Sequence, residues 1–532
     1  MNRVSRFNSR VAAALLGMGL AGAANGQPQA EIPPPRAVTE AEPAPRTILQ
    51  PGESPIDLES ALRLAGAENP ELHLARERIL EATAIRQLSA AQLLPNLNLG
   101  TNYNLHRGPL MQSNGSILSV NRDALYLGLG ANAVGSGTPN IPGLFYNVNV
   151  GAAWYGFLAS KQRVQTASAI SDAVRNDVLL RVSLAYLDLL RGEGRRAVAA
   201  KNRSEAAEVA RITAAYAKTG AGRKADADRA AVELKKRDAE FTQAEADALT
   251  ASARLAQLLN LDPSTRLKPI DGWVVPTPIV PDPIPLSELL AIALLQRPEL
   301  AARRSEVQQS LYELSLAKVL PFSPNVILGF SAGGFGGGSN LVADSGTGPR
   351  FSALDGRSDL DVVVFWTFRN LGVGNVALTR IADSRVRQMR FRELETLNLV
   401  RTQVAEAQAR TAARYLQIDA AEKAVRSSGE AYSEDLKRIL DARGLPLELI
   451  DSLRLLGRSR YEYLDAIIDY NRAQVQLWVA LGRPPANALA RPVPADLVPP
   501  PTIDVRPGPR VLPYPQVVPI PRSMPNPIAV KP

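Results

Sequence analysis

Two carboxylates near the end of the chain have a spacing that acid–base catalysis could use. Asp465 and Asp469 are four residues apart, so a helix would place both on one face. The chain has no Cys and only two His, His73 and His106, and neither His is near these carboxylates in sequence. We therefore interpret the pair as part of a solvated or intersubunit helix face, and we expect no metal site.

A glycine-rich stretch resembles the start of a nucleotide-binding motif. Gly372-Val373-Gly374-Asn375-Val376-Ala377 follows an apolar segment and begins a helix. The dinucleotide fold requires a second parallel strand about 20 residues further on, ending in an acidic residue. A long run of helix-forming residues follows here instead, and nothing else resembles a phosphate-binding loop. We expect no cofactor, no catalytic residue and no enzymatic activity.

The composition indicates a folded, helix-rich protein. Hydrophobic residues make up 45% of the 532 residues, and Ala and Leu are abundant whereas aromatic residues are only 5%. The net charge is +9, but the 61 basic and 52 acidic residues are interspersed along the chain. Interspersed charge gives no basic tract, so we expect no nucleic-acid partner.

The first 26 residues have the pattern of a secretory signal peptide. Arg3, Arg6 and Arg10 precede an apolar stretch too short for a membrane anchor, and small residues follow around Ala24 and Gly26. No later stretch has 18 consecutive apolar residues, so no transmembrane helix is expected. Such an exported chain is soluble, attached to a surface or part of a membrane β-barrel, and without Cys it is not a lipoprotein.

Proline-rich segments divide the chain into two similar halves. Asn69-Pro70-Glu71-Leu72 matches Arg297-Pro298-Glu299-Leu300 at an offset of 228 residues, which indicates a duplicated domain. Proline blocks helices, so the segments rich in it are predicted to be linkers or tails. We expect a signal peptide (1–26), an N-terminal linker (27–55), a first repeat (56–262), an inter-repeat linker (263–285), a second repeat (286–483) and a disordered tail (484–532).

Each repeat has the pattern helix, strand, strand, helix, helix. Val174, Val178, Val182, Ala185 and Leu189 form an apolar seam typical of helix–helix packing, and Leu397, Val400, Val404 and Ala407 form another. The expected helices are 57–94, 158–219 and 224–260 in the first repeat and 286–320, 371–443 and 447–482 in the second. The expected strands lie near 96–103, 145–150, 325–330 and 361–368, with long loops at about 105–143 and 331–360.

The lengths of these helices require an elongated assembly. The 73 residues of 371–443 would span roughly 110 Å, and the two shorter helices of each repeat, placed end to end, match the long one. Such helices bury their seams only in a long bundle or tube.

The strands need partners from other chains. Four strands cannot close a barrel, but three chains would supply twelve. Aromatic residues at the strand ends suit the interfacial girdle of an outer-membrane barrel, although a soluble helical protein with two small hairpins is the alternative. The candidate interface residues are Tyr146, Trp154, Tyr155, Phe365, Trp366 and Phe368.

The order of elements, the duplication and several phrases resemble the TolC-like outer-membrane efflux proteins. The phrases include Tyr186-Leu187-Asp188-Leu189-Leu190, Leu258-Leu259-Asn260-Leu261-Asp262-Pro263 and Tyr470-Asn471-Arg472-Ala473, within a resemblance that covers about 56–484. The resemblance implies a mostly α fold with a β-barrel part. A homotrimer would form a twelve-stranded barrel in outer-membrane lipid and a long α-helical barrel that crosses the periplasm.

The resemblance also implies a function. The trimer would be the passive exit duct of a tripartite efflux pump, linked by a periplasmic adaptor protein to an inner-membrane pump that supplies the energy. A duct for type I protein secretion remains an alternative, as do a non-conducting structural protein of the cell envelope and, from the residues alone, a periplasmic enzyme.

The breaks between the last two helices of each repeat would then form the periplasmic tip. Glycine allows the turn between antiparallel helices, so we expect adaptor docking at Gly220, Ala221 and Gly222 and at Gly444, Leu445 and Pro446. Rings of charge at a narrow pore filter ions, and ion pairs between hairpins could hold it shut, although an ordinary solvated helix face is the alternative. The candidate constriction residues are Asp226, Asp228, Arg229, Glu448, Asp451 and Arg454.

Overall fold

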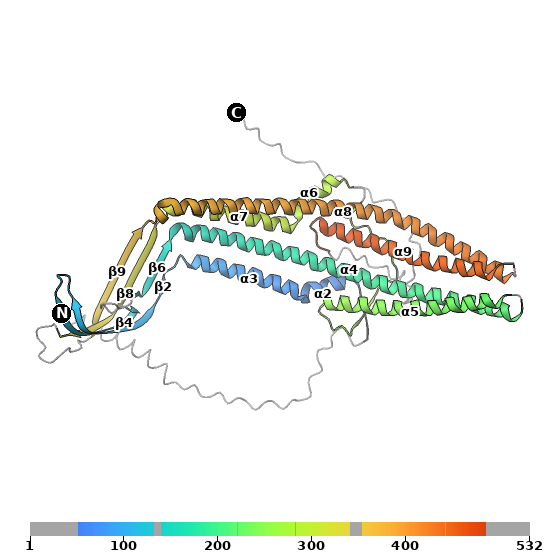
Figure 1. The fold of residues 1–532 in the computed structure, drawn as a ribbon, viewed down its shortest axis with the longest axis horizontal. Helices are drawn as coiled ribbons and strands as arrows, with labels where there is room; N and C mark the ends of the chain where they lie inside the picture. The colour runs from blue at the N-terminus through green and yellow to red at the C-terminus, as the bar shows by residue number, and fades with distance from the viewer. Residues whose placement is uncertain are drawn as a thin grey trace, which may run out of the picture.

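The computed structural model describes residues 52–131, 140–220, 222–281, 284–340, 354–441 and 443–485. These residues form an elongated molecule with a sheet at one end, long helices along its length and two helical hairpin tips at the other end (Figure 1). The predicted signal peptide (1–26) lies outside the described residues, as do most of the N-terminal linker (27–55) and all but the first two residues of the predicted tail (484–532).

Two long helices form the body of the molecule, one from each repeat. They are α4 (Val150–Lys218, 69 residues) and α8 (Val373–Leu440, 68 residues), each about 100 Å long at 1.5 Å per residue. Each turns back into a helix of half its length, α5 (Lys224–Leu258) or α9 (Pro446–Ala480). The predicted long helices are thus confirmed, although α4 begins earlier than expected.

The helix predicted at the start of each repeat is divided in two. Asn69 and Arg297 interrupt it because each precedes a proline, which disfavours helical geometry in the preceding residue. The Asn69 side chain accepts a hydrogen bond from the Glu71 amide (2.9 Å) and begins the second helix. The pairs are α2 (Leu58–Glu68) with α3 (Pro70–Ala91), and α6 (Leu286–Gln296) with α7 (Pro298–Val319).

The predicted apolar seams pack the helices against one another. Val178, Val182 and Leu189 are buried in a cluster with side chains of α2 and α5. Val400 and Val404 are buried in a second cluster with side chains of α6 and α9. Because α3 and α5 both pack along α4, and α7 and α9 along α8, the short helices lie end to end beside the long ones, as their lengths predicted (Figure 1).

The sheet is four strands wide, but its strands are longer than the sequence indicated. Strand β8 (Asn325–Ser339) pairs with β9 (Asp355–Phe365) along one edge. Its other edge pairs with β6 (Leu144–Asn149) and then with β4 (Ile117–Ala131). Strands β2 (Asn96–Leu97) and β3 (Leu99–Met111) form the outer edge beyond β6 and β4. The described parts of the expected loops at 105–143 and 331–360 are therefore largely strand, and their Gly and Asn residues lie within a ladder.

The strand position beside β8 is divided between β4 and β6, and a short additional strand lies between these two in sequence. Between β4 and β6 the short strand β5 (Ile141–Pro142) folds back onto the end of β4. Gly130 has a φ of 93°, and a Cβ there would lie 2.6 Å from the Gly143 nitrogen, so both the conformation and the space require glycine.

The two faces of the sheet differ in polarity. Paired residues share a face, so Tyr103 lies with Leu125, and Tyr146 lies with Leu328 and Val362. The opposite face has more polar residues. They include Asn102, Asn104, His106, Arg122, Tyr126, Asn147, Arg357, Asp359 and Asp361. The apolar face is exposed in the single chain at Leu99, Tyr103, Leu105, Leu360, Val362 and Val364.

The inter-repeat segment is a strap across the middle of the helices. It begins with β7 (Arg266–Pro269), which pairs in parallel with β1 (Glu53–Ile56). The Asn471 and Gln474 side chains of α9 then accept hydrogen bonds from the backbone amides of Thr277 (2.8 Å) and Val280 (3.0 Å). An expected linker thus has its backbone amides satisfied by specific side chains and is part of the packed structure.

Candidate functional site

The turn between α4 and α5 is the first predicted tip. Gly220 follows the end of α4 with a φ of 78°, the left-handed conformation that glycine adopts most readily. The Gly222 amide donates to the Tyr216 carbonyl (3.0 Å), which closes the turn. Ala221 lies outside the described residues. Gly220 is therefore needed for its backbone conformation, as the sequence predicted.

In the turn between α8 and α9, Gly444 is required because a side chain would not fit, rather than because of its backbone conformation. A Cβ on Gly444 would lie 3.0 Å from the Ile439 nitrogen and 3.1 Å from the Arg438 carbonyl carbon. Pro446 occupies the first turn of α9, where its missing N–H is not needed. Leu445 is 64% exposed, so an apolar side chain projects from the tip into solvent.

The two tips are joined to each other. The Tyr216 hydroxyl of α4 donates a hydrogen bond to the Ile439 carbonyl in the last turn of α8. Below this bond, a buried apolar cluster includes Ile212, Leu449 and Leu453, which come from both hairpins. The ends of the two hairpins therefore move together unless this contact breaks.

The predicted constriction residues fall into local pairs and one long-range pair. Asp226 pairs with Arg229 one turn further along α5 (3.2 Å), and Glu448 pairs with Arg438 (3.7 Å) across its own turn. Arg454 instead reaches from α9 to α5. Asp228 and Asp451 are exposed near the two tips. The structure thus gives a contact between the hairpins to Arg454 alone among the six candidates.

The partner of Arg454 is a buried carboxylate that the sequence did not reveal. Glu233 of α5 has a side chain only 3% exposed, and its Oε2 lies 2.9 Å from the Arg454 Nε. Its Oε1 lies 2.8 Å from the Nη2 of Arg237, which is also buried and pairs with Glu240 (2.7 Å). We call Glu233, Arg237 and Arg454 the inter-hairpin ion cluster. Glu233 and Arg237 are four residues apart in α5, which is the spacing of an ordinary exposed ion pair on a helix. The sequence therefore contains no signal that this pair is buried.

A second charged contact lies nearly two turns beyond Arg454 along α9, at Arg460. The Arg460 guanidinium forms a two-pronged ion pair with Glu205 of α4 (2.6 and 2.9 Å) and donates to the Asn202 side chain (2.9 Å). Gly457 allows this approach, because a Cβ there would lie 3.1 Å from the Asn202 amide nitrogen. Nearby, burial and the negative charge of Glu205 raise the pKa of Tyr432 to about 12.

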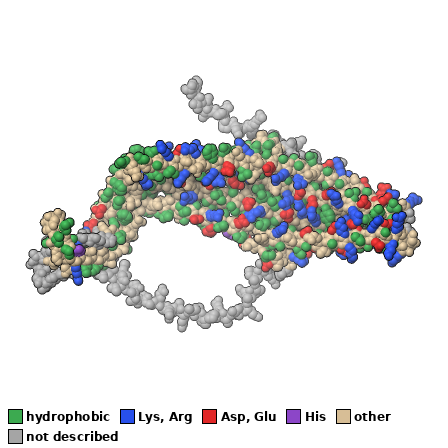
Figure 2. Space-filling view, in the orientation of Figure 1, with side chains coloured by type: hydrophobic (Ala, Val, Ile, Leu, Met, Phe, Trp, Pro, Cys, Tyr) green, Lys and Arg blue, Asp and Glu red, His purple; other side chains and the backbone are tan. Residues whose placement is uncertain are grey.

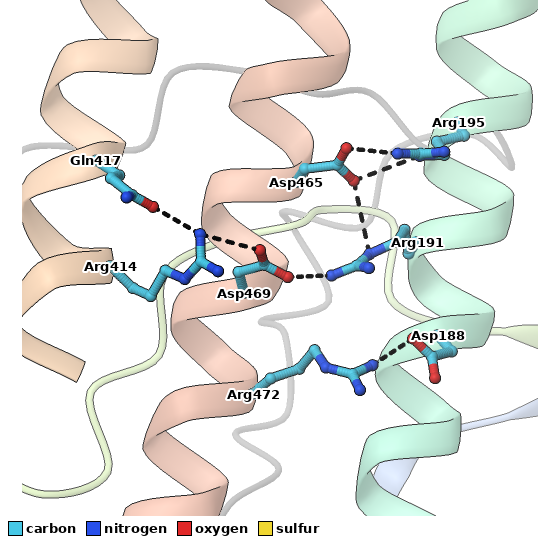
Figure 3. A network of polar contacts seen from close by, with 8 residues as sticks. All are labelled: Asp188, Arg191, Arg195, Arg414, Gln417, Asp465, Asp469 and Arg472. Carbon is cyan, nitrogen blue, oxygen red and sulfur yellow. Dashed lines mark hydrogen bonds and ion pairs between the residues drawn. The ribbon is translucent and has the colours of Figure 1, made fainter. Parts of the chain in front are cut away.

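Asp465 and Asp469 were expected on a solvated or intersubunit helix face, but they instead pair with arginines of other helices in the same chain (Figure 3). Asp465 pairs with Arg195 of α4 (2.5 Å) and Asp469 with Arg191 of α4. Arg414 of α8 also reaches Asp469 (3.3 Å), so the network joins three helices. The α4–α9 ion network consists of Asp188, Arg191, Arg195, Arg414, Asp465, Asp469 and Arg472.

This network lies on the side of α9 away from the strap. Asp469 and the strap ligand Gln474 are five residues apart, which places them about 140° apart around the helix. The carboxylates are matched by arginines and hold the two repeats together. They form no isolated acid–base pair.

The predicted interface aromatics gather where the sheet meets the helices. Tyr146 lies on the apolar face, whereas Phe365 pairs with Asn325 and lies on the opposite face. Trp154 and Tyr155 lie inside α4 rather than in a strand, because α4 begins directly after β6. Trp366 and Phe368 follow β9 and are 54% and 60% exposed.

The surface charge also differs between the sheet and the helices. Figure 2 shows Lys, Arg, Asp and Glu side chains interspersed over the helices and most densely toward the tips, with fewer on the sheet. Within the described part of the chain, no helix has the length and hydrophobicity needed to span a membrane.

No protein-family model and no curated protein sequence matches this chain. Solved structures do: the outer-membrane channel OprN has a TM-score of 0.64 at 20% identity, over 80% of this chain and 89% of that chain. The outer membrane protein VceC from Vibrio cholerae has 0.61 at 14% identity, over 80% and 95%. The Campylobacter jejuni CmeC outer membrane channel has 0.60 at 16% identity, over 80% and 85%. The chain therefore has the fold of the outer-membrane channels, as its resemblance to the TolC-like proteins predicted.

Proposed function

We propose that three copies of this chain form a passive efflux duct in the outer membrane. The sheets close into a twelve-stranded barrel, and the helices form a tunnel that extends into the periplasm. A periplasmic adaptor docks at the tip and an inner-membrane pump supplies the energy. The two repeats, 56–262 and 286–483, supply equal parts of barrel and tunnel.

The observation that carries this proposal is the sheet. Its apolar face is exposed at Leu99, Tyr103, Leu360 and Val362, a pattern that is unfavourable in water and suits lipid. Among the described strands none pairs with the outer edge of β9 or of β3, and a lipid-exposed sheet edge requires a partner. Copies of the same chain satisfy both requirements when the β9 edge of one pairs with the β3 edge of the next.

The hairpin tips supply the second part of the function. Gly220, Ala221, Gly222, Gly444, Leu445 and Pro446 form the docking surface for an adaptor, and Leu445 offers it an exposed apolar contact. The charges near the tip, Asp226, Asp228, Arg229, Glu448, Asp451 and Arg454, surround the narrow end of the tunnel. The inter-hairpin ion cluster holds the hairpins of one chain together and keeps this end closed.

Conductance of the purified protein in planar lipid bilayers tests the proposal. A duct inserts and gives discrete current steps, whereas a non-conducting structural protein gives none. A deletion strain provides the second readout, because loss of efflux raises its sensitivity to toxic small molecules. Absence of current from both the unmodified protein and the Arg454→Gln variant, each shown to be trimeric and membrane-inserted, would exclude the duct.

A further inference from the structure

The two repeats enter their long helices in different ways. In the first repeat Val150 begins α4 directly after β6 ends at Asn149. The Asn149 side chain caps this helix by accepting a hydrogen bond from the Ala152 amide (2.9 Å). In the second repeat residues 366–372 separate β9 from α8. The first repeat connects strand to helix without such a segment. The need for a connection therefore does not explain why the second repeat has residues 366–372.

The additional segment contains an unusual left-handed turn. Asn370, Leu371 and Gly372 have φ values of 50°, 58° and 92° in succession. Leucine is disfavoured in this conformation, because its Cβ approaches the following carbonyl oxygen. Such strain persists only where the surroundings impose it, and it often marks a functional position.

The surroundings hold this turn in place. The buried Asn375 side chain accepts a hydrogen bond from the Arg369 amide (2.7 Å). Gly374 leaves room for the turn, since a Cβ there would lie 2.9 Å from the Asn370 Oδ1. The result is that Leu371 is 98% exposed, the highest exposure among the large apolar side chains of the described residues.

Leu371 belongs to a set of exposed apolar residues at the strand-to-helix junction. The Trp366 indole N–H donates to the Phe322 carbonyl (3.2 Å), which fixes the ring at the junction. Trp366 follows directly on β9, whose apolar residues are exposed at Leu360, Val362 and Val364. We call the exposed set the junction patch, namely Phe322, Trp366, Phe368, Leu371 and Val373, which are 54% to 98% exposed.

We propose that the junction patch is a lipid anchor, with Leu371 inserted into the periplasmic leaflet of the outer membrane. This rests on the proposed function, which places the adjoining sheet in that membrane. Two features favour phospholipid over a second copy of the chain. Four of its five residues follow directly in sequence on β9 of the apolar sheet face, and the exposed Arg369 and Arg380, which lie on either side of Leu371 in sequence, can pair with lipid phosphates.

The absence of native cysteine allows a direct test. Single cysteines are introduced by Leu371→Cys, by Val362→Cys on the sheet and by Val232→Cys on α5 near the tip, and each carries an environment-sensitive fluorophore. All three side chains are exposed (98%, 60% and 68%), so labelling leaves the core intact. The full-length trimer is reconstituted in vesicles of phosphatidylethanolamine and phosphatidylglycerol. Nitroxide-labelled lipid and aqueous iodide serve as the two quenchers.

We expect nitroxide lipid to quench the labels at positions 371 and 362 several-fold more than the label at position 232. Iodide should give the reverse order. A label at 371 that iodide quenches, or that neither quencher reaches, would overturn the anchor. If position 362 is in lipid in that case, the proposed duct stands. If position 362 is also open to iodide, the membrane assignment itself fails.

Discussion

Replacing Arg454 with glutamine tests whether the inter-hairpin ion cluster keeps the tunnel closed. Arg454 is 49% exposed whereas its partner Glu233 is only 3% exposed, so the pair is neither a free surface pair nor fully buried. A hydrogen bond to a charged group contributes about 1.5–3 kcal/mol, and fully exposed pairs contribute under about 1 kcal/mol. Glu233 also keeps its pair with Arg237, which limits the loss.

We therefore expect Arg454→Gln to cost about 1.5 kcal/mol of inter-hairpin contact, or about a tenfold shift toward separated hairpins in each chain. The assay is single-channel recording in planar bilayers, where the variant trimer should spend at least about tenfold more time in high-conductance states. Glu233→Gln and the double variant complete a cycle. The double variant should differ little from Arg454→Gln alone if the two residues act as one contact.

Arg458→Gln is the matched control. It removes the same charge from the same helix, but Arg458 is 77% exposed and pairs with Glu462 in its own helix (2.7 Å). This variant should gate like the unmodified protein. Equal gating of the two variants, with trimer content and thermal stability unchanged, would refute the role of the contact between hairpins.

Three further expectations concern the tips and the helices. Gly220→Val forces a β-branched residue into a φ of 78°, at a cost of about 1–2 kcal/mol, and should reduce efflux in a susceptibility assay while native gels still show trimers. Gly457→Val, whose Cβ would lie 3.1 Å from Asn202, should lower the stability by about 1–3 kcal/mol, visible as a lower unfolding temperature. Tyr432 has its pKa raised from 10.0 to about 12, so the folded state holds the phenol proton more tightly than the unfolded state does. The contribution of Tyr432 to the free energy of unfolding is therefore complete below pH 10 and is lost as the pH rises from 10 to 12. Between pH 9 and pH 12, Tyr432→Phe should therefore lose about 1 kcal/mol less stability than the unmodified protein, as measured by denaturant unfolding. The expected difference is small because the Tyr432 ring is only partly buried. An identical pH dependence in the variant would contradict this assignment.

The long helices were predictable because their signals are local and repeated. Seam residues such as Val178 and Val182 recur at helical spacing over many turns, and a glycine with positive φ at 220 ends α4. The strands were predicted too short for the opposite reason. Gly333 and Gly337 in β8 have no side chain to indicate a strand, and they are glycine because a Cβ there would lie 2.4 Å from the Leu127 carbonyl oxygen or 2.5 Å from that of Asp123 in β4.

The candidate site was predictable only in its location. Gly220 and Gly444 marked the tips, and Arg454 was among the candidates. Glu233 was not, because a Glu with an Arg four residues later reads as a solvated pair. Its burial depends on α9 packing over α5, which is a tertiary contact between the repeats.

The two outer edges of the sheet are formed by different strands, β9 on one side and β2 with β3 on the other. Ring closure in the proposed trimer is therefore head to tail, and each subunit contributes two unlike edges. A chain damaged at β9 keeps a sound edge at β3, so it still joins a growing ring and then blocks its completion. When it is expressed beside the intact gene, such a variant would be dominant-negative for assembly. A variant that cannot fold at all would be recessive.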